Sequence, residues 1–440
     1  MILPHGWRTT TLNELARDGY GFVDGPFGSN LPASDYTLTG VPIIRGSNLS
    51  LGEARFRDDE FVFVSHESAK RLERSLCGPE DIIFTKKGTL GQVGFIPKGH
   101  RFDCFLVSSN QMKLSVDPRK ADPLYVYYYV SSPASRTKIV RDSEATGVPK
   151  INLAYLRRFP IDLPPLSEQR TISRLVGALD DKIDLNRRTN ETLEGIARAV
   201  FKSWFVDFDP VRAKAEGRRP AGMDAETAGA FCSSFHDSPV GRVPRGWRVT
   251  TVGNEFSLTM GQSPPGNTYN SVGAGLPFYQ GRADFQFRFP EPRVYCSSPT
   301  RAANPGDTLI SVRALVGSLN MAVEKCCIGR GVAAARHNSG SRSYTYYFMR
   351  SMEPEFSEFE AEGTVFGSIN KADFHNMGCV SAPQSVVDSF ERLVFPLDQE
   401  IEVNENQLIT LAALRDALVP KLLSGELRIR DAEKMVEAHV

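Results

Sequence analysis

The stretch GWRTTT at residues 6–11 returns as GWRVTT at residues 246–251. Other matches follow in the same order along the chain: PIIRG at 42–46 with PFYQG at 277–281, PEDIIF at 79–84 with PGDTLI at 305–310, Gly91 with Gly317, and Ile-Asn at 151–152 with Ile-Asn at 369–370. Residues 6–205 and 246–424 are therefore two copies of one unit. A chain built from two such copies has an approximate twofold axis, and its natural target also has two halves.

Each copy ends in a long run with the periodicity of an α-helix, at residues 166–205 and 384–424. The two stripes advance in alternating steps of four and three, and each position of the second equals one of the first plus 218: Ile172, Val176, Leu179, Ile183, Asn186, Asn190, Leu193, Ala197, Val200 and Trp204, then Phe390, Val394, Leu397, Ile401, Asn404, Leu408, Leu411, Arg415, Leu418 and Leu422. Such stripes are typical of helices that pack against a partner helix. Because the stripe continues for about five heptads, we expect an antiparallel coiled coil. The alternative is two separate amphipathic helices that each cover their own lobe.

Both stripes carry a polar residue at an equivalent position, Asn186 and Asn404. A buried Asn lowers stability but can fix the register, because only a hydrogen-bonding partner satisfies its amide. Equivalent positions of an antiparallel pair meet near its twofold axis. We therefore expect Asn186 near Asn404, with Leu179 and Leu397 as equivalent apolar members of the pairing face.

The helix signals divide the chain into six segments: a lobe at 1–165, a long helix at 166–205, a connector at 206–245, a second lobe at 246–383, a second long helix at 384–424, and a tail at 425–440. Pro164-Pro165 and Pro383 precede the helices, and Ser167 and Ser385 are candidate N-caps. The connector is rich in Pro, Gly, Ala and charge, which predicts an irregular segment with little core. The charged tail is expected to form a short helix or a loose end.

The lobes combine short strand signals with Gly-rich turns, which predicts mixed α/β structure. Candidate strands are Phe61–Val64, Ile82–Thr85, Leu309–Val312 and Ser318–Val323. The fold class is therefore α+β: two mixed α/β lobes related by a pseudo-twofold axis and separated by two long helices that form an antiparallel coiled coil.

Composition excludes several classes of protein. A hydrophobic content of 41% and a charged content of 24% are ordinary for globular proteins. The chain has no apolar run of about 18 residues, so we expect no membrane span, and its first residues do not resemble a signal peptide. The seven cysteines are scattered and the histidines lack metal-ligand spacing, so we expect a reduced cytoplasmic protein without a metal site.

Charge is distributed unevenly although the formal net charge is zero. Residues 279–350 carry nine Arg and one Lys against four acidic residues, while residues 381–440 carry eleven acidic residues against six basic ones. Arginine matters because its planar guanidinium binds guanine bidentately and also grips phosphate. A solvated surface is the plainer interpretation of such a segment.

Matching loops of the two lobes carry side chains suited to the edges of bases. These candidate DNA-binding residues are Arg45, Asn48, Lys86, Lys87, Thr89, Gln92, Asn110 and Gln111 in the first lobe, and Gln280, Arg282, Arg313 and Arg330 in the second. Arg, Lys, Asn and Gln discriminate bases in the major groove, although each loop alone also fits an ordinary turn. Their recurrence at equivalent places, with different side chains, favours one scaffold with two specificities.

Motifs of catalysis are missing from the sequence. It has no phosphate-binding GxxxxGK[ST] run, and neither Pro-Pro pair belongs to the Asn/Asp-Pro-Pro-aromatic run of amino-methyltransferases. Asp180-Asp181 lies within a helical run and is expected to be solvated. We expect no catalytic residues in this chain.

With these features in place, the chain closely resembles the specificity subunit of type I restriction–modification systems. The resemblance covers nearly all of it, through Gly6-Trp7, Gly246-Trp247, GPEDIIFTKKG at 78–88, PPLSEQR at 164–170, FKSWFVDFDPV at 201–211 and LVPKLLSGEL at 418–427. The second copy departs from the Pro-Pro-Leu-x-Glu-Gln pattern at 382–385, where it reads APQS.

The resemblance implies two target-recognition domains that each read one half of a split sequence in double-stranded DNA. It implies that the helices set the spacer and dock two adenine methyltransferase subunits, which bring S-adenosylmethionine. A restriction subunit, if present, would bring ATP and Mg²⁺. By itself the chain would be a non-catalytic subunit without a bound cofactor or metal. The alternatives are a two-lobed adaptor for another protein and a degenerate methyltransferase.

Overall fold

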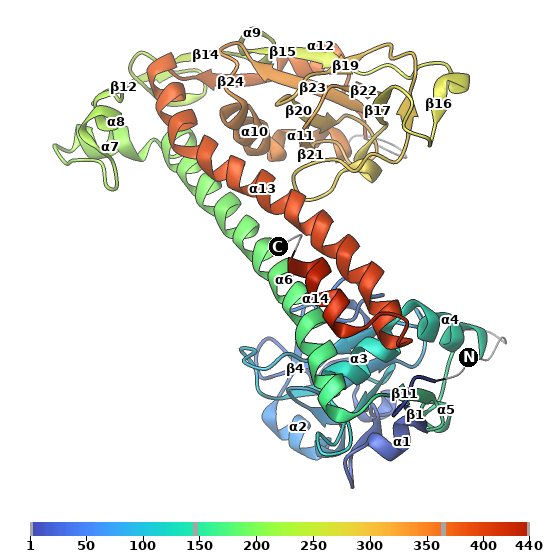
Figure 1. Ribbon diagram of the computed structural model, residues 1–440. Helices are drawn as coiled ribbons and strands as arrows, with labels where there is room; N and C mark the ends of the chain where they lie inside the picture. Colours follow the sequence, from blue (N-terminus) through green and yellow to red (C-terminus); the bar gives the residue numbers. More distant parts are fainter. Residues whose placement is uncertain (1–2, 144–147, 362–366, 438–440) are drawn as a thin grey trace. The chain divides into compact units, whose positions relative to one another are not determined.

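The computed structural model describes residues 3–143, 148–361 and 367–437 (Figure 1). The chain divides into two compact units. Unit 1 consists of Met1–Asn186 and Gln407–Val440, and unit 2 is Arg187–Asn406. Each unit therefore contains one lobe and parts of both long helices.

The lobe of unit 1 contains two main sheets and a two-stranded ribbon. The antiparallel sheet has the order β2 (Phe22–Asp24), β10 (Gln111–Leu114), β7 (Ile82–Thr85) and β8 (Val93–Phe95). The mixed sheet has the order β3 (Tyr36–Thr37), β5 (Val62–Val64), β4 (Val41–Ile44), β9 (Phe105–Val107) and β6 (Leu76–Cys77), with β4 parallel to β9. The ribbon pairs β1 (Arg8–Thr11) with β11 (Pro160–Leu163). The helices are α1 (Leu12–Leu15), α2 (His66–Arg71), α3 (Pro123–Ser131), α4 (Pro133–Arg141) and α5 (Leu153–Arg157).

The lobe of unit 2 repeats this topology strand for strand. Its antiparallel sheet has the order β15 (Phe256–Met260), β23 (Val332–His337), β20 (Thr308–Ser311) and β21 (Leu319–Met321). Its mixed sheet has the order β16 (Tyr269–Asn270), β18 (Tyr295–Cys296), β17 (Leu276–Tyr279), β22 (Cys326–Ile328) and β19 (Ala302–Ala303), with β17 parallel to β22. The ribbon pairs β14 (Arg248–Thr251) with β24 (Gly378–Ser381), and the helices are α9 (Val252–Glu255), α10 (Arg342–Ser351), α11 (Glu353–Ala361) and α12 (Lys371–Asn376). The internal repeat predicted from the sequence is confirmed.

The repeated Pro-x-Asp motif is a tight turn that leads into an inner strand of each antiparallel sheet, β7 or β20. The Asp81 carboxylate accepts a hydrogen bond from the Gly78 backbone N–H at 3.0 Å, and the Asp307 carboxylate accepts one from the Asn304 N–H at 2.7 Å. The residue before each Asp has a positive φ, 69° at Glu80 and 81° at Gly306. The motif recurs because both lobes need the same left-handed turn at this point.

The long helices are α6 (Leu166–Phe201) and α13 (Gln384–Leu423), and they pack antiparallel in each unit. In unit 1, Asp180 lies opposite Arg415 and Asn186 lies opposite Gln407. In unit 2, Asn190 contacts both Asn404 and Glu405. Higher numbers on α6 thus meet lower numbers on α13, which confirms the antiparallel pair predicted from the stripes. The stripe of unit 1 also joins the core of its lobe, with Ile172, Val176, Leu179, Ile183, Leu411, Leu418 and Leu422 all buried.

The helices begin slightly earlier than the expected caps. Leu166 and Gln384 are the first helical residues, so Ser167 and Ser385 lie inside the first turn and are not N-caps. At the start of α6, Gln169 bridges helix and lobe instead. Its Nε2 donates to the Pro164 carbonyl at 2.8 Å, and its Oε1 accepts from the Asp122 backbone N–H at 2.9 Å.

The segment that follows α6 is ordered and contributes to the core, contrary to the expectation of an irregular connector. It contains a π-helical turn (Lys202–Val206), α7 (Asp209–Ala215), α8 (Ala225–Gly229) and a hairpin of β12 (Phe235–Ser238) with β13 (Gly241–Pro244). Val211, Phe231 and Val243 are buried in the core of unit 2. The expectation was wrong because it rested on Pro, Gly and charge content, whereas few but large apolar residues anchor this segment.

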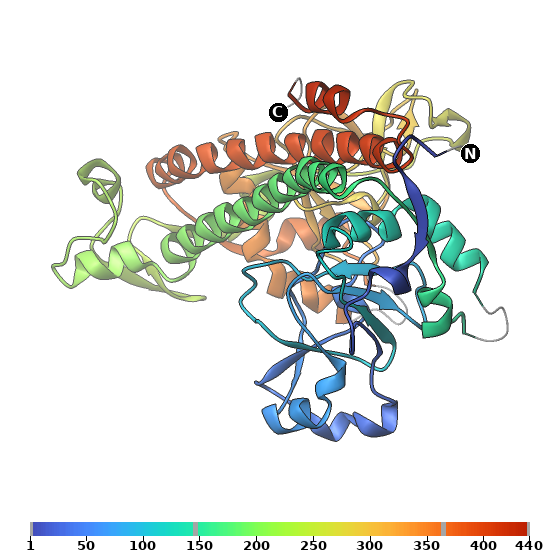
Figure 2. The same ribbon diagram turned by 60° about the horizontal axis from the view of Figure 1, so that its bottom comes forward.

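The tail forms α14 (Ile429–Glu437), which lies beside the C-terminal half of α13 (Figures 1 and 2). Ala432 is buried, and Ile429 and Val436 pack against the core of unit 1. Among the described residues, no helix is long and apolar enough to cross a membrane.

Candidate nucleic-acid interface

Three loops of the first lobe meet around one point at the ends of its sheets. The Lys86 backbone N–H donates to the Asn110 carbonyl at 2.7 Å, and the Ser108 N–H donates to the Ile44 carbonyl at 3.0 Å. Gly46 lies beside the side chains of Gln92 and Gln111, which a Cβ on this glycine would meet at 3.5 and 3.8 Å. The three candidate loops, 45–48, 86–92 and 108–111, thus form one cluster.

The second lobe builds the same cluster with the same backbone hydrogen bonds. The Val312 N–H donates to the Gly331 carbonyl at 2.9 Å, and the Gly329 N–H donates to the Tyr279 carbonyl at 2.8 Å. A Cβ on Gly331 would lie 2.2 Å from the Gln280 carbonyl oxygen, so only glycine fits there. The loops 280–284, 312–318 and 329–332 are therefore the counterparts of the first cluster.

A fourth loop joins each cluster through a glycine that the sequence analysis did not single out. A Cβ on Gly25 would lie 1.9 Å from the Ser108 carbonyl oxygen, and a Cβ on Gly261 would lie 2.1 Å from the Gly329 carbonyl oxygen. Both glycines follow the first strand of an antiparallel sheet, and this equivalent placement is the signal that could have revealed them. Two residues after Gly25, the ring of Phe27 is 78% exposed.

Seven of the candidate side chains are exposed on these clusters: Lys87, Thr89, Asn110, Gln280, Arg282, Arg313 and Arg330. Within the described part of the chain, no residue forms an ion pair with Lys87, Arg282, Arg313 or Arg330. Cations that are not neutralised within their own lobe are available to a polyanion. The second cluster presents three arginines and the first presents one lysine with Thr89 and Asn110.

Two candidates belong to the scaffold of the loops instead. Asn48 is fully buried: its Oδ1 accepts from the Arg45 N–H at 2.9 Å, and its Nδ2 donates to the Arg57 and Asp59 carbonyls. Gln111 is 2% exposed and accepts a hydrogen bond from the Ser108 hydroxyl. Their placement corrects the expectation that these two amides face DNA, because both are already bonded inside the lobe.

The second lobe has a carboxylate where the first has the amide of Asn48. Asp284 is 8% exposed, and its Oδ2 accepts from the Gln280 N–H at 2.7 Å. Each of these residues closes the same short 3₁₀ turn. The correspondence explains why a polar residue recurs at this position without reading a base.

The remaining three candidates are half-buried and partly engaged. Arg45 donates through Nη2 to the Glu60 carbonyl at 2.7 Å. Lys86 Nζ lies 3.1 Å from an Asp24 carboxylate oxygen, and Gln92 Oε1 accepts from the Thr85 hydroxyl at 3.2 Å. These side chains border the exposed cluster and shape it.

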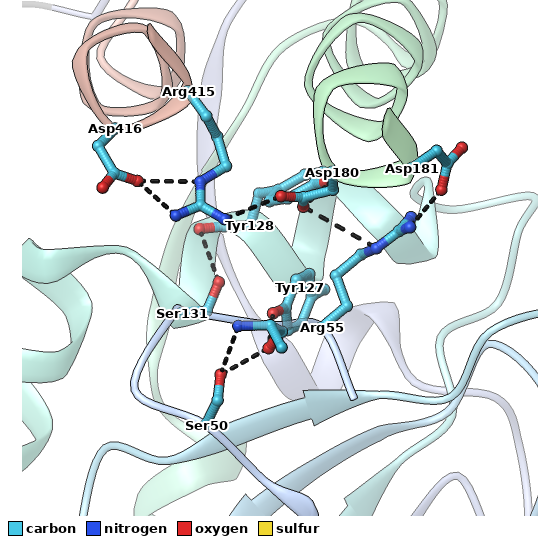
Figure 3. Close-up of polar contacts among 10 residues, drawn as sticks. Ser50, Arg55, Tyr127, Tyr128, Ser131, Asp180, Asp181, Arg415 and Asp416 are labelled. Atoms are coloured by element: carbon cyan, nitrogen blue, oxygen red, sulfur yellow. Dashed lines mark hydrogen bonds and ion pairs between the residues drawn. The ribbon is translucent and has the colours of Figure 1, made fainter. Parts of the chain in front are cut away.

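A second polar cluster lies where the first lobe contacts its long helices (Figure 3). Arg55 points toward Asp180 and Asp181 of α6, and its Nε lies 3.9 Å from Asp180. Asp180 also accepts from the Tyr128 hydroxyl at 2.7 Å and from Arg415 of α13 at 2.9 Å. Asp180 is therefore buried and paired rather than solvated as expected, whereas the side chain of Asp181 is 71% exposed.

Unit 2 contains a matching cluster around Arg288, which is 1% exposed. Its guanidinium donates to Asp398 at 2.9 Å and to the Tyr347 hydroxyl at 2.8 Å, and it lies 3.9 Å from the centroid of the Tyr346 ring. Burial acts to lower the pKa of Arg288, while Tyr346, Asp398, Tyr347 and Glu194 raise it more strongly. Arg288 is thus a buried, permanently charged group.

Neither cluster has the composition of a metal centre. Among the described residues, no group of three or more His, Cys, Asp or Glu side chains is placed to hold a metal ion. The loop clusters instead offer exposed hydrogen-bond donors, and the buried clusters join the lobes to the helices.

Two comparisons with known proteins bear on the family of the chain. The family model described as "Type I restriction modification DNA specificity domain" matches residues 42–195. The putative type I restriction enzyme MjaX specificity subunit of Methanocaldococcus jannaschii is 26% identical over 439 residues, covering 97% of this chain and 95% of the relative. The HindI specificity subunit of Haemophilus influenzae is 24% identical over 383 residues, covering 74% of this chain and 82% of the relative. The chain is therefore similar to type I restriction–modification specificity subunits over nearly its whole length.

A solved S subunit of a type I restriction–modification system from M. genitalium has a fold similar to that of this chain. The TM-score is 0.63 at 14% identity, over 96% of this chain and 98% of that one. The family match at 42–195 spans the first lobe from β4 onward and most of α6. The second lobe lies outside this match but has the same strand order in its sheets as the first lobe.

Proposed function

We propose that this chain is the specificity subunit of a type I restriction–modification complex and gives that complex its DNA sequence specificity, with each lobe reading one half of a bipartite target. The observation that carries the proposal is the pair of loop clusters, which share their backbone hydrogen bonds but expose different side chains. One scaffold with two sets of donors is the arrangement that two different half-sites require.

The exposed side chains suit the major groove of double-stranded DNA. Arginine binds guanine bidentately, Asn and Gln bind adenine, and the methyl group of Thr contacts that of thymine. Arg282, Arg313 and Arg330 favour guanine or phosphate in the half-site of the second lobe, whereas Lys87, Thr89 and Asn110 give the first lobe a mixed set. Phe27 adds an apolar surface beside the first set.

We further propose that the long helices set the spacer and dock two adenine methyltransferase subunits. Several apolar residues of the helices are exposed: Leu185, Ile196, Leu393, Val403 and Ile409, with Ile409 at 70%. Leu185 and Val403 are equivalent members of the two helical repeats, separated by 218 positions. Repeated apolar positions suit two copies of one partner. The partners would supply S-adenosylmethionine, and a restriction subunit would supply ATP and Mg²⁺.

The test is to reconstitute the complex from the purified chain and the methyltransferase subunit. We expect adenine methylation at one bipartite sequence only when both proteins are present. Duplex binding should weaken steeply with salt, because contacts to phosphate release counterions. Binding that is insensitive to salt, with no effect of the chain on methylation, would favour the protein-adaptor alternative. Methyl transfer by the chain alone would favour the degenerate methyltransferase.

A further inference from the structure

Arg55 and Arg288 occupy the same position in the two lobes. The Phe95 N–H donates to the Arg55 carbonyl at 2.7 Å, and the Met321 N–H donates to the Arg288 carbonyl at 2.9 Å. Phe95 and Met321 end the equivalent strands β8 and β21. The backbone of each arginine is therefore held by the sheet while its side chain extends to a long helix.

The helix partners are also equivalent. Asp180 on α6 and Asp398 on α13 are separated by 218 positions, the offset of the two helical repeats. Each also accepts a hydrogen bond from a lobe tyrosine, Tyr128 at 2.7 Å and Tyr347 at 3.2 Å. These tyrosines lie in the corresponding helices α3 and α10. The same set of Arg, Asp and Tyr thus joins lobe to helix in both units, and we call it a joint. Its members are Arg55, Asp180 and Tyr128 in unit 1, and Arg288, Asp398 and Tyr347 in unit 2.

Each joint is completed by a charged residue of the other long helix. Arg415 of α13 lies 2.9 Å from Asp180, and Glu194 of α6 lies 3.4 Å from Arg288. In the two helical repeats, the position equivalent to Arg415 is Ala197, and the position equivalent to Glu194 is Ala412. These two charges are therefore not repeated. Every lobe is therefore tied to both helices at once.

Such a joint restricts angle as well as distance. The Arg288 guanidinium hydrogen-bonds Asp398 and Tyr347, whereas the Arg55 guanidinium hydrogen-bonds Asp181 and lies at ion-pair distance from Asp180. The hydrogen bonds of such a planar group weaken when the geometry changes. Two apolar surfaces can slide over each other at little cost, whereas a buried ion pair cannot shift without leaving a charge unpaired. The joint therefore resists rocking of a lobe on its helices.

We propose that the two Arg–Asp–Tyr joints are positioning elements that make the subunit selective for spacer length. This inference rests on the proposed function. A spacer that differs by one base pair moves a half-site by about 3.4 Å and by about a tenth of a turn. A lobe held at a fixed angle misses such a site, and a lobe that rocks on its helices reaches it.

The experiment uses the reconstituted complex and duplexes that carry the two half-sites of the host methylome. The duplexes have the natural spacer, or one base pair fewer or more. The main variant is Arg288→Met with Asp398→Leu, which removes both partners. Glu194 keeps an ion pair with Arg350, whose Nη2 lies 3.3 Å from its carboxylate. Arg248→Met is the control, because the side chain of Arg248 is 75% exposed and lies in the same lobe.

We expect the double variant to recognise the same half-sites. Its preference for the natural spacer should fall by about tenfold, a size found for residues that couple two sites. Arg288→Lys keeps the positive charge but loses the planar guanidinium, so its preference for the natural spacer should lie between those of the double variant and the wild type. Arg55→Met should lower this preference as the double variant does. An unchanged ratio, with methylation falling equally for all three spacers, would overturn the inference and leave the proposed function standing. No bipartite methylation by the wild-type complex would overturn the proposed function itself.

Discussion

Asn404 donates a hydrogen bond from Nδ2 to Oδ1 of Asn190, 2.9 Å away across the helix pair of unit 2. Asn190 in turn donates to Glu405 at 2.8 Å, and in unit 1 Asn186 donates to Gln407 at 3.0 Å. Every one of these buried amides thus has a polar partner on the opposite helix. The expected approach of Asn186 to Asn404 involves residues of different units and stays a prediction.

The pair of Asn190 and Asn404 gives a first test of how the helices are held in register. Asn404→Leu alone leaves the buried Oδ1 of Asn190 without its hydrogen-bond donor. This variant should lower the free energy of unfolding by about 1–3 kcal/mol. Replacing both residues by Leu leaves no unpaired amide, so the free energy of unfolding should fall by less than in the single variant. Urea unfolding of the wild type, both single variants and the double variant measures the coupling. Strictly additive effects would show that the hydrogen bond contributes nothing specific.

The exposed cations give a second test, this time of the loop clusters. Arg313→Ala should alter only the half-site of the second lobe, and Lys87→Ala only that of the first. If the residue reads a base, its replacement by Ala should weaken binding by about 1–3 kcal/mol and relax the sequence preference at one position of the target. A residue that touches only phosphate should weaken all sequences alike and lower the slope of affinity against salt. Competition binding with single-base variants distinguishes these results, and unchanged binding by both alanine variants would remove these residues from the interface.

Gly25 gives a third test, because its contact with the Ser108 carbonyl leaves no room for a side chain. Gly25→Ala should displace one of the two loops, lower stability by about 1–3 kcal/mol, and weaken recognition of the first half-site only. Gly28→Ala is the matched control, since a Cβ on Gly28 meets no atom within 4 Å. Thermal melting and half-site binding measure both effects. Equal behaviour of the two variants would contradict the close approach at Gly25.

His337 gives a fourth test, through the pH dependence of stability. Burial lowers its pKa from the ordinary 6.5, against an opposing effect of Glu255 and Asp388. Below pH 6.5 the unfolded chain therefore binds the proton more readily than the folded chain, so stability present above that pH is lost as pH falls through the folded pKa. In His337→Asn the free energy of unfolding should fall less steeply between about pH 7 and 5 than in the wild type. The control is His236→Asn, at an exposed position, which should follow the wild-type profile. Parallel profiles for all three proteins would exclude His337 as the cause.

Much of the fold follows from periodicity that the sequence displays directly. The constant offset of 218 predicts the helix pair, and the recurrent Pro-x-Asp motif precedes one inner strand in each lobe, at Ile82–Thr85 and near Leu309. These features depend on local patterns, because a helix stripe or a turn is encoded by residues close in sequence. Boundaries were less well predicted, as Ser167 and Ser385 show.

The contacts that assemble the joints could not be predicted in this way. Asp180 resembles an ordinary surface residue of a charged helix until the fold brings Arg55, from 125 positions away, and Arg415 beside it. Arg415 likewise interrupts an apolar stripe without local reason. At the candidate interface, residue type alone could not separate the exposed Asn110 from the buried Asn48, because burial depends on the tertiary arrangement of loops.

The central claim is that this chain selects the bipartite DNA sequence that the complex recognises, and that each lobe reads one half of it. The most direct measurement is methylome sequencing of a host with the gene intact, with the gene deleted, and with Arg313→Ala in its place. We predict adenine methylation at one bipartite motif in the first strain, its loss in the second, and a motif relaxed in one half only in the third. A methylome that is identical in the intact and deleted strains would contradict the account.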